Sequence, residues 1–134
     1  MGIAIFDLDG TVLDGDTDGL WGEFLAYKGV IDGDEYRRGF EKFLEQYDRG
    51  ELDIDSAYRF LLTQMNVVSR SELDNLREQF AQEVLRKKLL PAALREIRRH
   101  KECGRYTLMV TATNRYTSLA SAQLAEVDTL IATD

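Results

Sequence analysis

The sequence is poor in the residues on which several kinds of site depend. Its 134 residues include one cysteine, one histidine and one proline. A single cysteine excludes a disulfide within the chain, and a single histidine leaves almost no material for a histidine-based triad or a histidine-rich zinc site. Any chemistry must therefore come from carboxylates and hydroxyls.

The sequence also lacks membrane and export signals. No apolar run is long enough to cross a bilayer, and the segment before Asp7 lacks the basic residues of a signal peptide. The apolar fraction of 44% and the charged fraction of 31% are ordinary for a globular protein. We expect a cytoplasmic protein with no membrane partner.

Basic residues are in the minority, with 17 Lys and Arg against 24 Asp and Glu and a net charge of −7. Because nucleic acid binding requires a basic surface, a nucleic acid partner is not expected. One basic cluster has helical spacing, which indicates a solvated helix face. It consists of Arg95, Arg98, Arg99 and Lys101 around His100.

Three short apolar segments, at residues 2–6, 106–110 and 129–132, predict buried strands of a parallel sheet. Helical patterns at 92–102 and 116–126 lie between the second strand and its neighbours. The resulting order of strand, helix, strand, helix, strand predicts an α/β fold with a partial, three-stranded Rossmann-like sheet.

A block of helical periodicity interrupts the first crossover and predicts a small antiparallel bundle of four helices. Capping or stop residues mark the helix ends: Gly29, Gly50, Asp53 or Asp55, and Ser69 with Glu72. Aromatic residues of the block are expected in the bundle core rather than on a partner surface: Trp21, Tyr36, Phe40, Phe43, Tyr47 and Tyr58. We therefore expect a helical cap at 16–90 and a core domain at 1–15 and 91–134.

Polar groups follow the ends of the first two predicted strands. Asp7 and Asp9 come directly after the first strand, and Thr111 begins a predicted turn at 111–114 after the second. Ligands of open α/β sheets bind beyond the carboxyl ends of the strands, so these side chains should converge. Gly10 allows a sharp turn between them.

Two carboxylates so close together require either a proton on one or a cation between them. Both arrangements suit phosphoryl transfer. One carboxylate attacks phosphorus and forms an aspartyl-phosphate, while the other protonates the leaving oxygen and later deprotonates water. A hard cation such as Mg²⁺ offsets the negative charge. The pattern predicts a magnesium-dependent hydrolase of phosphorylated small metabolites.

The segments FDLDGT at 6–11 and VTATN at 110–114 resemble the first two motifs of the haloacid dehalogenase (HAD) superfamily. The inserted cap and the segment DGLWGEFL at 18–25 resemble its phosphoserine-phosphatase-like branch, subfamily IB. The resemblance covers nearly the whole chain.

The resemblance implies a role for each matching residue. Asp7 would be the nucleophile and a magnesium ligand, and Asp9 the acid/base, with its backbone carbonyl also on the metal. Thr111 and Ala112 would bind phosphate, with Gly10 beside them. The substrate-facing acid of phosphoserine phosphatases corresponds to Asp16, which is one methylene shorter than their glutamate.

The family continues with a lysine and then an acidic motif after a fourth strand, and neither has a counterpart in this sequence. Arg115 could place positive charge near Thr111, but an exposed arginine at a helix start is the favoured interpretation. We expect a fragment that is inactive alone, truncated at its C-terminus. Its first strand would expose an apolar edge for self-association.

Two other functions fit parts of the sequence. A catalytically inactive member of the family could serve as a binding module. The run Asp14–Gly19 matches the first half of a calcium-binding EF-hand loop, but Leu25 stands where the loop needs a bidentate glutamate.

Overall fold

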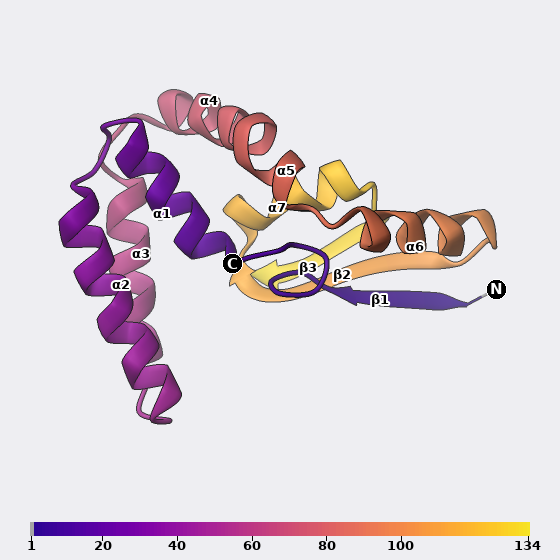
Figure 1. Ribbon diagram of the computed structural model, residues 1–134, viewed down its shortest axis with the longest axis horizontal. Coiled ribbons are helices and arrows are strands. Elements are labelled where there is room, and N and C mark those ends of the chain that lie inside the picture. The colour runs from indigo at the N-terminus through magenta and orange to yellow at the C-terminus, as the bar shows by residue number, and fades with distance from the viewer. Residues whose placement is uncertain (1) are drawn as a thin grey trace. The chain divides into compact units, whose positions relative to one another are not determined.

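The computed structural model describes residues 2–134 and divides the chain into two compact units (Figure 1). One unit is Met1–Leu20 with Arg77–Asp134, and the other is Trp21–Leu76. The predicted cap at 16–90 and core domain at 1–15 and 91–134 stay predictions. The two compact units instead divide the chain after Leu20 and after Leu76. Within residues 2–134, no helix is both long enough and apolar enough to span a bilayer.

The first unit contains a parallel sheet of three strands in the order β1-β2-β3. The strands are β1 (Ile3–Asp7), β2 (Tyr106–Asn114) and β3 (Thr129–Thr133). The predicted α/β class with a three-stranded parallel sheet is confirmed. The predicted turn at 111–114 is wrong, because β2 continues through it with a shift of register against β3 between Val110 and Asn114.

The helices α6 (Pro91–Glu102) and α7 (Arg115–Ala125) cover one face of the sheet and both contact β2 (Figure 1). Pro91 occupies the first turn of α6, as expected from its missing N–H. Asn114 caps α7 by accepting a hydrogen bond from the Thr117 amide at 3.0 Å. Met109 of β2 is fully buried under these helices.

The opposite face of the sheet is open among the described residues. Ile3 and Ile5 of β1 are 65% and 66% exposed, and Ile131 of β3 is 50% exposed. The sequence predicted strands buried on both faces, and that prediction is wrong for this face. Alternate side chains of a strand point to opposite faces, and α6 and α7 lie on the face of Ala4 and Met109.

Four α-helices make up most of the predicted helical block. They are α1 (Thr17–Tyr27), α2 (Gly33–Asp48), α3 (Ile54–Met65) and α4 (Arg70–Phe80). Two predicted caps are confirmed. Asp53 accepts a hydrogen bond from the Ser56 amide at 3.2 Å, and the Ser69 hydroxyl accepts one from the Glu72 amide at 3.2 Å.

The predicted helix that Ser69 and Glu72 begin does not continue unbroken to the end of the helical block. A π-helical turn, η1 (Ala81–Leu85), follows α4 and leads into the short α5 (Arg86–Lys88). The wider turn shifts the side chains that follow it relative to those of α4. Phe80, just before the turn, and Leu85, its last residue, are both fully buried.

Aromatic stacking forms much of the core of the second unit. The Tyr36 ring stacks on Phe40 and on Phe60, with centroids 5.7 Å apart in each pair. Gly22 leaves room for Tyr36, because a Cβ at this position would lie 1.9 Å from the ring. Tyr47, expected in the core, is 68% exposed, since it lies in the last turn of α2 at the end of the aromatic stripe.

The open sheet face predicts that the 134-residue chain associates with itself. Ile5→Lys should reduce the oligomer fraction seen by sedimentation velocity, because a lysine keeps its charge hydrated and opposes burial of this face against a second chain. Stability should change by about 1 kcal/mol or less, since the side chain is already two-thirds exposed. Leu44→Lys, on an exposed position of α2, is the matched control. A wild-type chain that stays monomeric at high concentration contradicts the prediction.

Candidate active site

The loop after β1 is organised around one carbonyl. The Leu8 carbonyl accepts the amides of residues 11–13 at 2.9–3.1 Å, and the Leu8 side chain is fully buried. Gly10 has φ +74°, a left-handed conformation that an L-residue rarely adopts. The loop is fixed to the chain before α6, because the Asp14 amide donates to the Lys88 carbonyl at 2.8 Å.

Asp7 lies at the carboxyl end of β1, where it is paired in register with Val110 of β2. Its side chain is exposed, and its Oδ2 accepts a hydrogen bond from the Thr11 hydroxyl at 2.8 Å. The Thr11 hydroxyl thus ties the turn. A carboxylate oxygen at this place is accessible for attack on a ligand beyond the strand end.

Asp9 is held by donors from two segments of the chain, the start of α1 and the end of β2. Its Oδ1 accepts hydrogen bonds from the Thr17 amide at 2.7 Å and the Thr17 hydroxyl at 2.5 Å. Its Oδ2 accepts hydrogen bonds from the hydroxyls of Thr113 at 2.7 Å and Thr111 at 3.3 Å. The structure therefore brings Asp9 and Thr111 together, as the sequence predicted.

Thr17 and Thr113 were not predicted as site residues. A signal for Thr113 was present, because Thr111 and Thr113 are two residues apart and share one face of an extended strand. The Thr113 amide also donates to the Thr111 hydroxyl at 3.2 Å. Thr17, by contrast, has no periodic signal, since it reaches Asp9 through the fold of the intervening loop.

The predicted phosphate contacts have other partners in this structure. The Gly10 amide donates to the carbonyls of Leu13 and Gly15 at 3.0 and 3.1 Å. The Ala112 carbonyl accepts a hydrogen bond from the Thr133 hydroxyl at 2.7 Å. The phosphate-binding roles of Gly10, Ala112 and Thr111 stay predictions.

Two further carboxyl groups lie near Asp9. Asp16 Oδ1 accepts the amides of Asp18 and Gly19 at 2.9 and 3.2 Å, so this side chain helps to start α1. Burial, with a smaller contribution from the Asp9 charge, raises the pKa of Asp16. Burial and the charges of Asp16 and Asp9 raise the pKa of Asp18 to about 7. This part of the site gathers three carboxyl groups, and burial favours the neutral form of two of them, Asp16 and Asp18.

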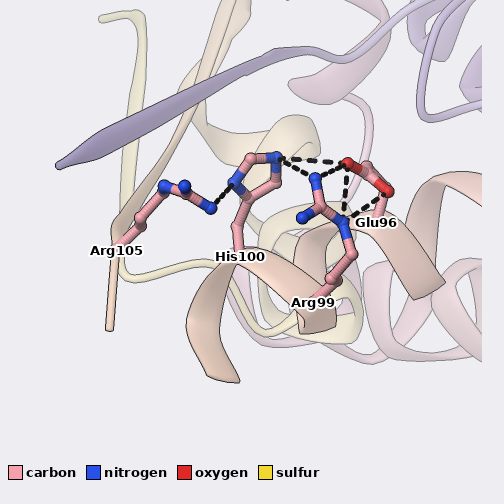
Figure 2. A network of polar contacts seen from close by, with 4 residues as sticks. All are labelled: Glu96, Arg99, His100 and Arg105. Carbon is pink, nitrogen blue, oxygen red and sulfur yellow. Dashed lines mark hydrogen bonds and ion pairs between the residues drawn. The ribbon is translucent and has the colours of Figure 1, made fainter. Parts of the chain in front are cut away.

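The lone histidine makes structural contacts. Figure 2 shows His100 between Arg105, whose Nη1 lies 3.2 Å from His100 Nδ1, and Glu96, whose Oε1 lies 3.2 Å from His100 Nε2. The ring also meets Phe6 edge-on, with centroids 5.8 Å apart. A hydrogen bond from Arg99 lowers the pKa of Glu96. The basic cluster predicted as a solvated face is therefore partly neutralised by Glu96.

Arg115 begins α7 and is directed toward the end of β3. Its Nε donates to Asp134 Oδ1 at 2.5 Å, and its Nη1 and Nη2 donate to the carbonyls of Leu130 and Ala132 at 3.2 and 3.4 Å. The exposed-arginine interpretation describes it better than a role beside Thr111. Within residues 2–134, no group of three or more His, Cys, Asp or Glu side chains is arranged to hold a metal ion.

The raised pKa of Asp18 predicts a specific pH dependence of stability. The pKa of Asp18 is about 7 in the folded protein and 3.8 ordinarily. The contribution of Asp18 to the free energy of unfolding is therefore full below about pH 4 and is lost as the pH rises through 7. Asp18→Asn should therefore gain stability over the wild type between pH 4 and 8, by a few kcal/mol at most. Urea denaturation across this range measures the difference, with Asp14→Asn as an exposed control. Parallel curves for Asp18→Asn and wild type would rule the prediction out.

Comparisons with known proteins show relatives over nearly the whole chain. The histidinol-phosphatase of Neisseria meningitidis serogroup C (strain 8013) is 31% identical over 131 residues, or 98% of this chain and 59% of that protein. A solved protein with unknown function from Bordetella pertussis Tohama I is 38% identical with a TM-score of 0.89, over 98% of this chain and 60% of that one. The chain spans about three fifths of the length of both.

A more distant structure has the same fold. The phospho-aspartyl intermediate analogue of phosphoserine phosphatase is 14% identical with a TM-score of 0.60, over 98% of this chain and 55% of that one. A family model described as haloacid dehalogenase-like hydrolase matches residues 4–134. The sequence, the sheet and this match agree, and the chain belongs to the haloacid dehalogenase-like hydrolase family.

Proposed function

We propose that the protein is a magnesium-dependent phosphomonoester hydrolase that forms an aspartyl-phosphate on Asp7. The observation that carries the proposal is an exposed Asp7 at the end of β1, two residues before Asp9. The Asp9 carboxylate accepts hydrogen bonds from hydroxyls of β2. Membership of a hydrolase family supports it.

The two carboxylates have different tasks in this proposal. An Asp7 oxygen attacks phosphorus and forms a P–O bond, while the bond from phosphorus to the ester oxygen breaks and leaves its electron pair on that oxygen. Asp9 gives a proton to the leaving oxygen. It then takes a proton from the water that attacks the aspartyl-phosphate and restores Asp7.

The donors at the end of β1 fit a magnesium ion. The Asp7 carboxylate and the Asp9 backbone carbonyl are hard oxygen ligands. The resemblance to the family implies the Asp9 carbonyl as the second ligand, and the Asp9 carboxylate oxygens have other partners in Thr17, Thr111 and Thr113. These two oxygens would hold part of the coordination shell of Mg²⁺, and in the family an acidic motif after a fourth strand completes the site. The ion would offset the charge of Asp7 and the phosphate.

The substrate is proposed to be a small phosphorylated metabolite. The name of the Neisseria relative, a histidinol-phosphatase, makes histidinol phosphate the first compound to test. Asp16 and Asp18, in their ionised forms, would place negative charge beside Asp9 that favours a positively charged substrate group. The role of Asp16 as a substrate contact and a cytoplasmic location stay predictions.

The calcium-loop alternative has weak support in the structure. Asp16 Oδ1 accepts hydrogen bonds from the amides of Asp18 and Gly19. Leu25, at the twelfth loop position, is fully buried. A calcium loop of this kind requires an accessible carboxylate there. A catalytically inactive binding module remains the alternative. Measurable turnover of a phosphomonoester by the protein that carries these residues would favour the hydrolase over it.

The nucleophile assignment predicts the effect of Asp7→Asn. In the protein that carries these residues, turnover of a generic phosphomonoester should fall by about 1000-fold or more, because the amide is a far weaker nucleophile. Thermal unfolding should change little, since the side chain is exposed. Asp14→Asn, in the same loop, is the control and should keep its activity. Near-normal turnover by Asp7→Asn would refute the assignment.

The metal assignment predicts that a chelator removes activity and that added Mg²⁺ restores it. The cation is needed because Asp7 and a phosphate ester would otherwise place like charges together. Steady-state turnover before and after chelation, and after titration with MgCl₂, measures the effect. Full activity in excess chelator is the outcome that excludes a metal-dependent mechanism.

A further inference from the structure

We infer that Thr17 and Thr113 are positioning residues that hold the Asp9 carboxylate for proton transfer, with Oδ2 as the oxygen that carries the proton. This inference rests on the proposed function and adds residues that neither the sequence analysis nor the comparisons assign. Asp9, Thr17 and Thr113 all belong to one compact unit, so their geometry is internal to it.

The two oxygens of Asp9 differ in the kind of donor that they meet. Oδ1 accepts from the Thr17 amide and hydroxyl, at 2.7 and 2.5 Å. A backbone amide can only donate a hydrogen bond, so a proton on Oδ1 would oppose the Thr17 N–H. The bonds to Oδ1 therefore fix it as an acceptor and anchor the carboxylate to the first residue of α1.

Oδ2 meets hydroxyl groups, those of Thr113 at 2.7 Å and Thr111 at 3.3 Å. A hydroxyl can rotate and accept a hydrogen bond instead of donating one. Oδ2 can therefore carry a proton without leaving a donor facing a donor. In the proposed reaction this proton passes from Oδ2 to the leaving oxygen as the ester P–O bond breaks.

The two threonines also restrict rotation of the Asp9 side chain. Thr17 is fully buried, and its β-branched side chain has few rotamers, so its hydroxyl has a fixed place. The Thr113 amide donates to the Thr111 hydroxyl, which links the two threonines of β2. Turning the carboxylate away would break bonds to α1 and β2 together. The expected result is a carboxylate held in one orientation.

The test compares leaving groups, because an alkyl phosphate needs a proton donor and p-nitrophenyl phosphate does not. In the protein that carries these residues, Thr113→Val should lower kcat/KM for an alkyl phosphate by about 30-fold or more, and for p-nitrophenyl phosphate by less than about 3-fold. The ratio kcat/KM includes steps only through phosphoryl transfer, so later hydrolysis does not obscure it. Thr113→Ser, which keeps the hydroxyl, should restore kcat/KM to within about 3-fold of wild type.

Thr129→Val is the matched control. It removes a hydroxyl at the amino end of β3, bonded to the Tyr106 hydroxyl, and should leave both substrates unaffected. If Thr113→Val does not fold, Thr113→Ala gives the same comparison. Thr17→Val is an independent test with the same expected dependence on the leaving group.

Three outcomes are distinguishable. Equal losses with both substrates would indicate a merely structural role for Thr113 and overturn the inference, and so would wild-type behaviour with both. In these cases an inactive Asp7→Asn would still leave the proposed function standing. An active Asp7→Asn would instead show that the proposed function itself has failed, whatever Thr113→Val does.

Discussion

The geometry of the candidate site depends on the hydrogen bonds that converge on the Asp9 carboxylate. They join the loop after β1 to the first residue of α1 and to the end of β2, segments that are 8 and 104 residues away in the chain. Asp9 therefore connects the start of the helical block to the sheet as well as serving as the proposed acid/base.

The same arrangement concentrates negative charge. Burial is the main cause of the raised pKa of Asp16 and of Asp18, and the nearby Asp9 charge adds to it in both. Asp18 receives a long hydrogen bond of 3.4 Å from the Asn114 side chain. A cation or a positively charged substrate group would relieve this repulsion, which links the proposed metal and substrate classes to one electrostatic cause.

The sequence predicted the sheet and the meeting of Asp9 with Thr111, because the carboxyl ends of parallel strands share one edge. It did not predict Thr17, since a threonine in a loop carries no periodic signal, or the continuation of β2 through 111–114. The π-turn η1 was missed because one extra residue hardly disturbs a helical pattern. The predicted burial of Ile3 and Ile5 was wrong, because residue type alone does not show which face of the strand packs against α6 and α7.

The exposure of Asp7 and the open sheet face have a common origin in the alternation of β1. Ile3, Ile5 and Asp7 share one face of this strand, and the alternate residues Ala4 and Phe6 point toward the face covered by helices. A strand with the opposite alternation would turn Ile3 and Ile5 toward the helices. It would bury Asp7 with them, and a buried carboxylate is costly. The alternation of side chains that leaves Ile5 exposed thus also leaves the proposed nucleophile, Asp7, accessible at the strand end.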